Sequence, residues 1–114
     1  MKKILLITND MDTIALLSTW LEGKGYLVKN TLNDEEALEL LEDFVPHIVM
    51  VDVVHHQLIL KIKENITGTK VALLILTGYT GEENEPGEKS NDYVEKPFDL
   101  PLLQQKIDQI LSET

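Results

Sequence analysis

The sequence predicts an α/β fold in which a parallel β-sheet is covered by helices on both faces, a three-layer sandwich. Short apolar runs alternate with amphipathic segments along the 114 residues. Continuous apolar runs are typical of strands buried on both faces, and their alternation with helical patterns is typical of parallel α/β units. A chain of this length is expected to form a single domain, residues 1–114.

The predicted strands are rich in valine, leucine and isoleucine, with polar residues on either side. There are five of them, at residues 4–7, 26–30, 47–54, 70–77 and a short stretch within 91–98. Parallel connections between such strands need a crossover, so the segments between them are expected to be helices that cover the sheet.

The segment after the first strand predicts an amphipathic helix. Its apolar positions recur at helical spacing: Ile14, Leu17 and Leu21. Asp10 or Asp12 can cap the start of this helix, and Gly23 or Gly25 can end it.

The remaining helices are predicted from caps and apolar spacing. Asn33 and Glu36 have the spacing of a capping box before residues 34–44, and residues 57–66 form a short amphipathic pattern. Asp99 can cap a final helix, whose apolar stripe is Leu100, Leu103, Ile107 and Ile110. Residues 78–90 are rich in glycine and acids and are predicted to be a loop.

Charge and composition exclude several classes of function. The chain has 20 acids and 10 bases, a net charge of −10, so we expect no binding to nucleic acid or to anionic membranes. It has no cysteine, which excludes disulfides and thiol chemistry. With no signal-peptide core and no membrane-length apolar run, we expect a cytoplasmic protein.

The polar residues that follow the predicted strands are the candidate functional residues. Asp52 follows the apolar run of the third strand, Thr77 ends the fourth strand, and Lys96 lies at the end of the fifth. The carboxyl ends of parallel strands meet at one edge of a sheet, and ligands of open α/β sheets bind at that edge. We therefore expect these side chains to converge there.

These residues and the segments around them resemble the receiver domain of two-component response regulators over nearly the whole chain. The matching segments are KKILLIT, LEGKGY, NDEEALELLEDFVPHIVMVD, ILTGY and NDYVEKPFDL. The resemblance implies a flavodoxin-like fold with five strands in the order 2-1-3-4-5. Residues 78–90 fall where such a domain has its fourth helix, which we expect to be short or missing.

The resemblance also assigns roles to single residues. Asp52 falls on the phosphoacceptor, Thr77 on the residue that contacts the phosphoryl group, and Tyr93 on the switch aromatic. Lys96 falls on the cationic partner of the phosphoryl group, and the Lys96–Pro97 peptide is expected to be cis.

The first strand departs from the family pattern, which has two adjacent acids at its end. Here the corresponding residues are Thr8 and Asn9, followed by Asp10. Because Mg²⁺ prefers carboxylate oxygens, the sequence predicts a weak or absent metal site built from Asp52, Asn9 and Asp10. Asp10 could replace a missing acid if the strand shifted by one residue, or it could cap the first helix.

The segment after Asp52 departs as well, because it runs almost directly into the next helix. His55 and His56 could bind a metal with Asp52, but adjacent residues of an extended segment point to opposite sides, which favours an ordinary turn.

The sequence therefore predicts a stand-alone, atypical receiver domain, a phosphoprotein of phosphorelay signalling that is not an enzyme. We expect it to act through contacts with a histidine kinase or another signalling protein, as a monomer or weak dimer. A pseudo-receiver with the same fold and no phosphorylation is the main alternative. A small flavin- or nucleotide-binding protein is less favoured, because TNDMD after the first strand has no glycine to cradle a phosphate.

Overall fold

The computed structural model describes residues 2–52, 56–77, 92–95 and 100–112, and in residues 56, 77 and 92–95 it describes the backbone. Within these ranges five parallel strands form one sheet in the order β2-β1-β3-β4-β5. The strands are β1 (Lys3–Ile7), β2 (Leu27–Thr31), β3 (Ile48–Asp52), β4 (Ala72–Thr77) and β5 (Asp92–Glu95). The fold class and strand order expected from the sequence are confirmed.

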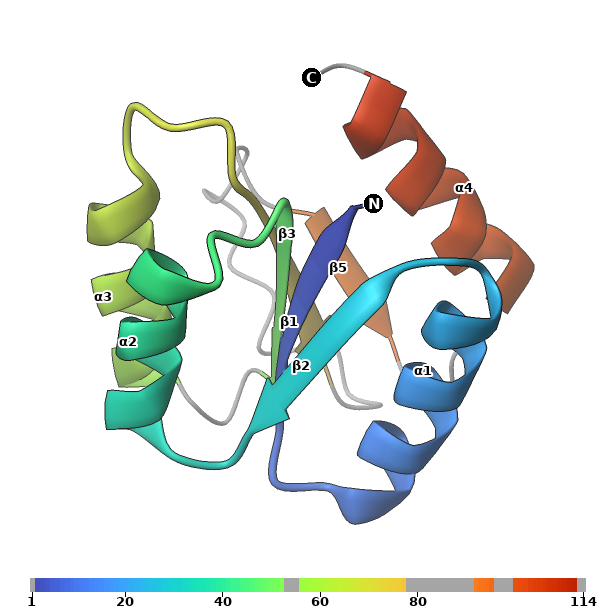
Figure 1. Cartoon of the computed structure of the whole chain (residues 1–114), viewed down its shortest axis with the longest axis horizontal. Helices are drawn as coiled ribbons and strands as arrows, with labels where there is room; N and C mark the ends of the chain where they lie inside the picture. Colours follow the sequence, from blue (N-terminus) through green and yellow to red (C-terminus); the bar gives the residue numbers. More distant parts are fainter. Residues whose placement is uncertain (1, 53–55, 78–91, 96–99, 113–114) are drawn as a thin grey trace.

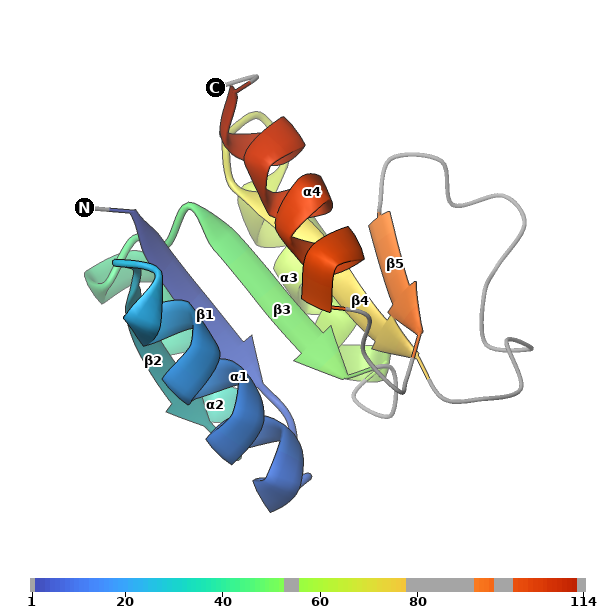
Figure 2. The ribbon, with the colours of Figure 1, turned by 90° about the vertical axis from the view of Figure 1, so that its right-hand side faces the viewer.

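Helices cover both faces of the sheet (Figures 1 and 2). They are α1 (Met11–Gly23), α2 (Asp34–Asp43), α3 (His56–Ile66) and α4 (Leu100–Ser112). In Figure 1, α1 and α4 lie on one side of the sheet and α2 and α3 on the other. None of the helices within the described ranges has the length and apolar character needed to cross a membrane.

The strands supply two separate apolar cores because alternate side chains point to opposite faces of the sheet. In β1, Ile4 and Leu6 join the core under α1 and α4, whereas Leu5 and Ile7 join the core under α2 and α3. All four side chains are fully buried. The continuous apolar run in the sequence thus reflects burial on both faces.

The first helix has the caps that the sequence predicts. Asp10 accepts a hydrogen bond from the backbone N–H of Asp12 at its start. At its end Gly25 has a φ of 97°, and the N–H groups of Gly25 and Tyr26 donate to the carbonyls of Glu22 and Leu21. This is a Schellman ending, in which glycine adopts the left-handed conformation at little cost.

The second helix departs in one detail from the capping box. The Asn33 side chain accepts from the Glu36 N–H at 2.9 Å, as expected. The Glu36 carboxylate, however, accepts from the Thr31 hydroxyl rather than from the Asn33 N–H, which donates to Thr31 Oγ1 at 3.0 Å. Thr31, which is buried at the end of β2, therefore stands between the Asn33 N–H and the Glu36 carboxylate and replaces their direct hydrogen bond.

Some strand boundaries differ from the prediction. The fourth strand begins at Ala72 rather than at residue 70, because Thr69 and Val71 form a turn in which the Val71 N–H donates to Thr69 Oγ1 at 3.2 Å. The third strand is described up to Asp52, and the last two residues of the predicted 47–54 strand lie outside the described residues. The predicted loop at 78–90, with its short or missing helix, lies outside them too.

Candidate functional site

Asp52 is the last residue of β3, the central strand of the sheet. Its side chain is buried, with 7% of its surface exposed. A carboxylate rarely occupies a buried position unless other groups compensate its charge by hydrogen bonding or ion pairing. The position of Asp52 follows from the sequence, because the acid comes directly after the apolar run of β3. It therefore lies at the carboxyl end of the strand, at the edge of the sheet where ligands of parallel sheets bind.

Thr8 supplies one of the compensating groups. Its hydroxyl donates a hydrogen bond to Asp52 Oδ2 at 3.2 Å, and the side chain is fully buried. The register explains the contact, because Ile7 of β1 pairs with Val51 of β3, so that the next residue on each strand lies beside the other. The sequence marked Thr8 as a position lacking an acid, but it did not reveal that the hydroxyl contacts Asp52.

Asp10 caps the start of α1. Its Oδ1 accepts from the Asp12 N–H at 3.1 Å and its Oδ2 accepts from the Thr13 hydroxyl at 2.8 Å. The Asp10 N–H in turn donates to Thr8 Oγ1 at 3.1 Å. A chain of hydrogen bonds thus runs from the Asp52 carboxylate through Thr8 to the first turn of α1.

Capping, rather than a shifted strand, is therefore the structural role of Asp10. A shift of one residue would reverse the faces of β1, whose residues 4–7 fill both cores as they stand.

For two of the other predicted site residues, the structure describes the position in a strand but not the side chain. Thr77 ends β4, and since Asp52 pairs with Leu76, Thr77 lies one position beyond it at the same edge of the sheet. Tyr93 lies in β5 opposite Ile75. The side chains of Thr77 and Tyr93, the whole of Lys96 and Pro97, and His55 fall outside the described residues, so their predicted roles stay predictions.

The donor groups at this edge are a poor match for Mg²⁺. Magnesium is usually held by one or two carboxylates together with waters in octahedral order. Both Asp10 oxygens serve the helix cap, Asn9 is exposed, and Asp52 Oδ2 accepts from Thr8. Over the ranges that the structure describes, no three histidine, cysteine or acidic side chains are grouped to hold a metal ion. The described residues therefore do not fit the ion, and the weakened magnesium site stays a prediction.

His47 occupies the opposite edge of the sheet, just before β3. The Lys3 N–H donates to His47 Nδ1 at 3.0 Å, and the His47 N–H donates to the Lys3 carbonyl at 2.8 Å. Burial lowers the pKa of His47 below its ordinary value, and the nearby positive charges of Lys2, Lys3 and the N-terminus lower it further. The ring is thus held neutral as a hydrogen-bond acceptor.

Comparison with known proteins finds two related sequences. One is an uncharacterised 14.6 kDa protein of Leptolyngbya boryana, which is 35% identical over an aligned length of 114. The alignment covers 90% of this chain and 87% of that protein. The other is a probable cyclic di-GMP phosphodiesterase of Vibrio cholerae, 30% identical over 112 residues. The match covers 91% of this chain but spans only 25% of the phosphodiesterase. No protein-family model matches the sequence.

Solved structures give a more specific comparison. A two-component response regulator from Clostridium difficile superposes with a TM-score of 0.81 at 26% identity, covering 98% of this chain and 97% of that one. A putative response regulator from Chloroflexus aurantiacus gives a TM-score of 0.76 at 27% identity, covering 98% and 99%.

Two further structures contain the response regulator TrrA. In a complex with the histidine kinase ThkA, the matched chain gives a TM-score of 0.79 at 23% identity, with 97% of this chain and 99% of that chain covered. TrrA of Thermotoga maritima in complex with Mg²⁺–BeF gives a TM-score of 0.78 at 22% identity, with 96% and 99% covered. At these identities the likeness concerns the fold.

Proposed function

The chain belongs to the receiver domains of two-component response regulators, and on that premise we propose that it takes part in a phosphorelay by accepting a phosphoryl group on Asp52. The observation that carries the proposal is the position of this acid, at the end of the central strand and 7% exposed. A buried carboxylate at the ligand-binding edge of an α/β sheet is a common mark of a functional group.

The chemistry is a transfer between oxygens. One oxygen of the Asp52 carboxylate attacks the phosphorus of the donor and forms a new P–O bond. The bond between phosphorus and the donor breaks, and the leaving group departs with its electron pair. The Thr8 hydroxyl, 3.2 Å from Oδ2, supports the proposal because it holds the carboxylate in one orientation.

Lys96 and Thr77 are proposed to contact the phosphoryl group, on the basis of the family resemblance and of their positions in the sequence. Thr77 ends the strand next to Asp52, and Lys96 directly follows β5. A cation and a hydroxyl near the transferring group would stabilise the charge that develops on its oxygens. Tyr93 is proposed to report the modified state to a partner.

The partner is proposed to be a histidine kinase or another signalling protein. The complex of ThkA with TrrA supports this, because TrrA shares the fold of the present chain over almost its whole length. The net charge of −10 favours a protein partner with basic groups over any nucleic acid.

A pseudo-receiver, which keeps the fold without being phosphorylated, is the second candidate. The Thr8 contact favours it, because a hydroxyl occupies the space beside Asp52 where the family pattern has a carboxylate. The two candidates differ in whether Asp52 reacts, so one experiment separates them.

That experiment is incubation of the intact protein with acetyl phosphate, with and without Mg²⁺, followed by intact mass spectrometry. We expect a mass gain of one phosphoryl group in the wild type and none in Asp52→Asn. The matched control is Asp10→Asn, which should retain the gain because Asp10 caps α1. Wild-type protein that stays unmodified under conditions where it is folded would support the pseudo-receiver.

A further inference from the structure

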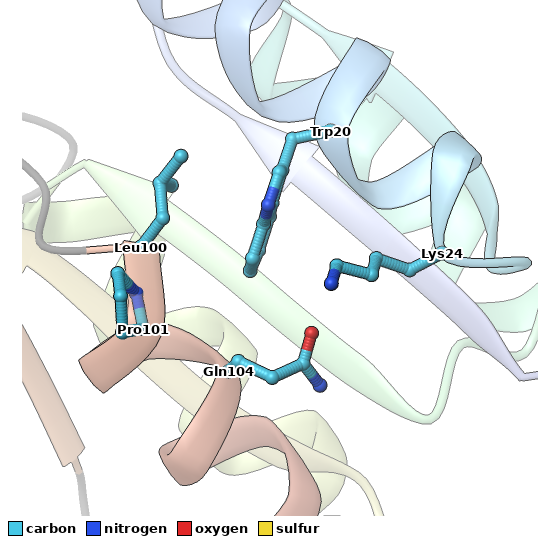
Figure 3. Close-up of a pocket in the computed structure, with 5 residues that line it drawn as sticks. All are labelled: Trp20, Lys24, Leu100, Pro101 and Gln104. Carbon is cyan, nitrogen blue, oxygen red and sulfur yellow. The ribbon is translucent and has the colours of Figure 1, made fainter.

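A hollow between α1 and α4 lies away from Asp52 and has no role in the function proposed above. It has a volume of about 440 Å³ and is lined by Trp20, Lys24, Leu100, Pro101 and Gln104 (Figure 3). This volume lies within the range of sites that hold small organic ligands. The side chains from both helices converge on the space between them.

Gln104 presents a hydrogen-bond acceptor to this hollow. Its amide nitrogen donates to Asp108 Oδ1 at 2.8 Å and to the Tyr26 hydroxyl at 3.5 Å. Because a carboxylate only accepts hydrogen bonds, the Asp108 contact fixes the orientation of the amide. The amide oxygen therefore faces Trp20 and Lys24, as Figure 3 shows.

This oxygen is buried and has no hydrogen-bond partner among the described residues. A buried acceptor without a donor is costly, and most such groups in native proteins have a partner. Because this oxygen has almost no accessible surface, the O–H or N–H group of a ligand could supply the missing donor only when the Trp20 or Lys24 side chain beside it moves aside.

Trp20 and Lys24 give the hollow an aromatic surface and a positive charge. The Lys24 ammonium lies 5.7 Å from the centre of the Trp20 ring, close enough for a cation–π contact. Among the described residues, the exposed Lys24 ammonium has the Trp20 ring as a partner and forms no ion pair with a carboxylate. It could therefore pair with an anionic ligand without giving up an ion pair.

Leu100 and Pro101 form the apolar part of the lining at the start of α4. Together with the indole of Trp20 they offer two apolar surfaces from opposite helices, which suits a flat ring. The hollow thus combines an apolar lining, one cation and one acceptor that needs a donor.

We propose that the hollow between α1 and α4 binds a small aromatic carboxylate that carries a hydroxyl or N–H donor. The carboxylate pairs with Lys24, the ring packs against Trp20, Leu100 and Pro101, and the donor reaches Gln104 Oε1. This inference is independent of whether Asp52 is phosphorylated.

The chain contains a single tryptophan, Trp20, so its fluorescence reports directly on the hollow. We expect 4-hydroxybenzoate to change this fluorescence in a saturable way. Lys24→Met should weaken binding about tenfold because it removes the charge and keeps most of the stem, whereas Lys24→Arg should bind nearly as well as the wild type. Gln104→Met should abolish the preference for 4-hydroxybenzoate over benzoate, which lacks the donor.

The matched control is Lys29→Met, because Lys29 also lies over an aromatic ring, 5.5 Å from the centre of Phe44, but outside the hollow. It should leave the affinity unchanged, and circular dichroism should show that every variant is folded. The proposal is wrong if folded wild-type protein gives no saturable change, if Lys29→Met weakens binding as much as Lys24→Met, or if the cation tyramine binds better than 4-hydroxybenzoate.

Discussion

At each end of the β1–β3 pair, a hydrogen bond joins residues that lie 44 positions apart in the sequence. At the amino-terminal end the Lys3 N–H donates to His47 Nδ1 at 3.0 Å, and at the carboxyl-terminal end the Thr8 hydroxyl donates to Asp52 Oδ2 at 3.2 Å. Both contacts tie the same two central strands together, but the first involves a backbone donor and the second a side-chain donor.

The charges at the two ends are opposite. Burial lowers the pKa of His47, and the positive charges of Lys2, Lys3 and the N-terminus lower it further, which keeps the ring neutral. The Lys3 ammonium also donates to the Phe44 carbonyl at 3.1 Å and lies 5.6 Å from the centre of that ring. At the other end the Thr8 hydroxyl donates a hydrogen bond to the buried Asp52 carboxylate. The same hydroxyl oxygen accepts a hydrogen bond from the Asp10 N–H at the start of α1.

The difference agrees with the proposal that the His47 end is structural and that the Asp52 end carries the reactive group. A neutral imidazole that accepts a backbone N–H joins the two strands by a hydrogen bond. An oriented carboxylate at the ligand-binding edge has the chemistry of an acceptor. Substitutions at the two ends should therefore have different consequences, and three of them test the comparison.

The largest effect is expected from Thr8→Val, which keeps the shape of the side chain but removes the hydroxyl. Asp52 then loses a donor and the Asp10 N–H loses an acceptor, so the free energy of unfolding should fall by about 2 kcal/mol. Urea denaturation measures this loss. The control is Thr13→Val, whose hydroxyl contacts the exposed Asp10 carboxylate and should matter less. Equal losses in both variants would contradict a special role for Thr8.

A smaller effect is expected from Thr8→Asp, which places a second carboxylate beside Asp52. The paired acids should raise the affinity for Mg²⁺ at least about tenfold, which corresponds to about 1.4 kcal/mol. The increase in melting temperature with Mg²⁺ concentration measures it. Thr8→Asn has the same shape without the charge and should bind the ion like the wild type. If both variants gain affinity equally, the missing acid is not what weakens the site.

The smallest effect is expected at the structural end, from the titration of His47. Its pKa is lowered in the folded protein, so its contribution to stability is complete above about pH 6.5, the ordinary histidine pKa, and is lost as the pH falls from there to the folded pKa. Protonation of Nδ1 would turn the acceptor of the Lys3 N–H into a donor.

The matched variant is His47→Asn, whose amide oxygen can still accept from the Lys3 N–H but does not titrate. Urea midpoints of both proteins should be compared between about pH 7.5 and pH 5. The wild type should lose more stability than His47→Asn over this range. An identical decline would show that another group is responsible.

The helices and strands were predictable because their determinants are local in the sequence. The continuous apolar runs of β1, β3 and β4 indicate double-sided burial, and the caps at Asp10 and Asn33 lie where the residue types predict them. The strand order did not follow from these patterns and came from the family resemblance, because pairing between strands depends on contacts far apart in the sequence.

The candidate site was predictable only in part. Asp52 stands out as a lone acid after a buried strand, but the hydrogen bond from Thr8 depends on the register between β1 and β3. A sequence pattern shows which residues end each strand, not which of them touch. The hollow at Trp20 and Gln104 was missed for the same reason, since its two walls come from helices at opposite ends of the chain.

The proposed role of Asp52 is tested most directly by identifying the side chain that carries the phosphoryl group. An aspartyl phosphate is an acyl phosphate, which borohydride reduces to homoserine, so the modified residue can be read from its peptide by mass spectrometry. If Asp52 is the acceptor, homoserine should appear at position 52 after treatment with acetyl phosphate and should be absent from untreated protein. Homoserine at position 10 or at another acid, with Asp52 intact, would overturn the assignment of Asp52 as the acceptor.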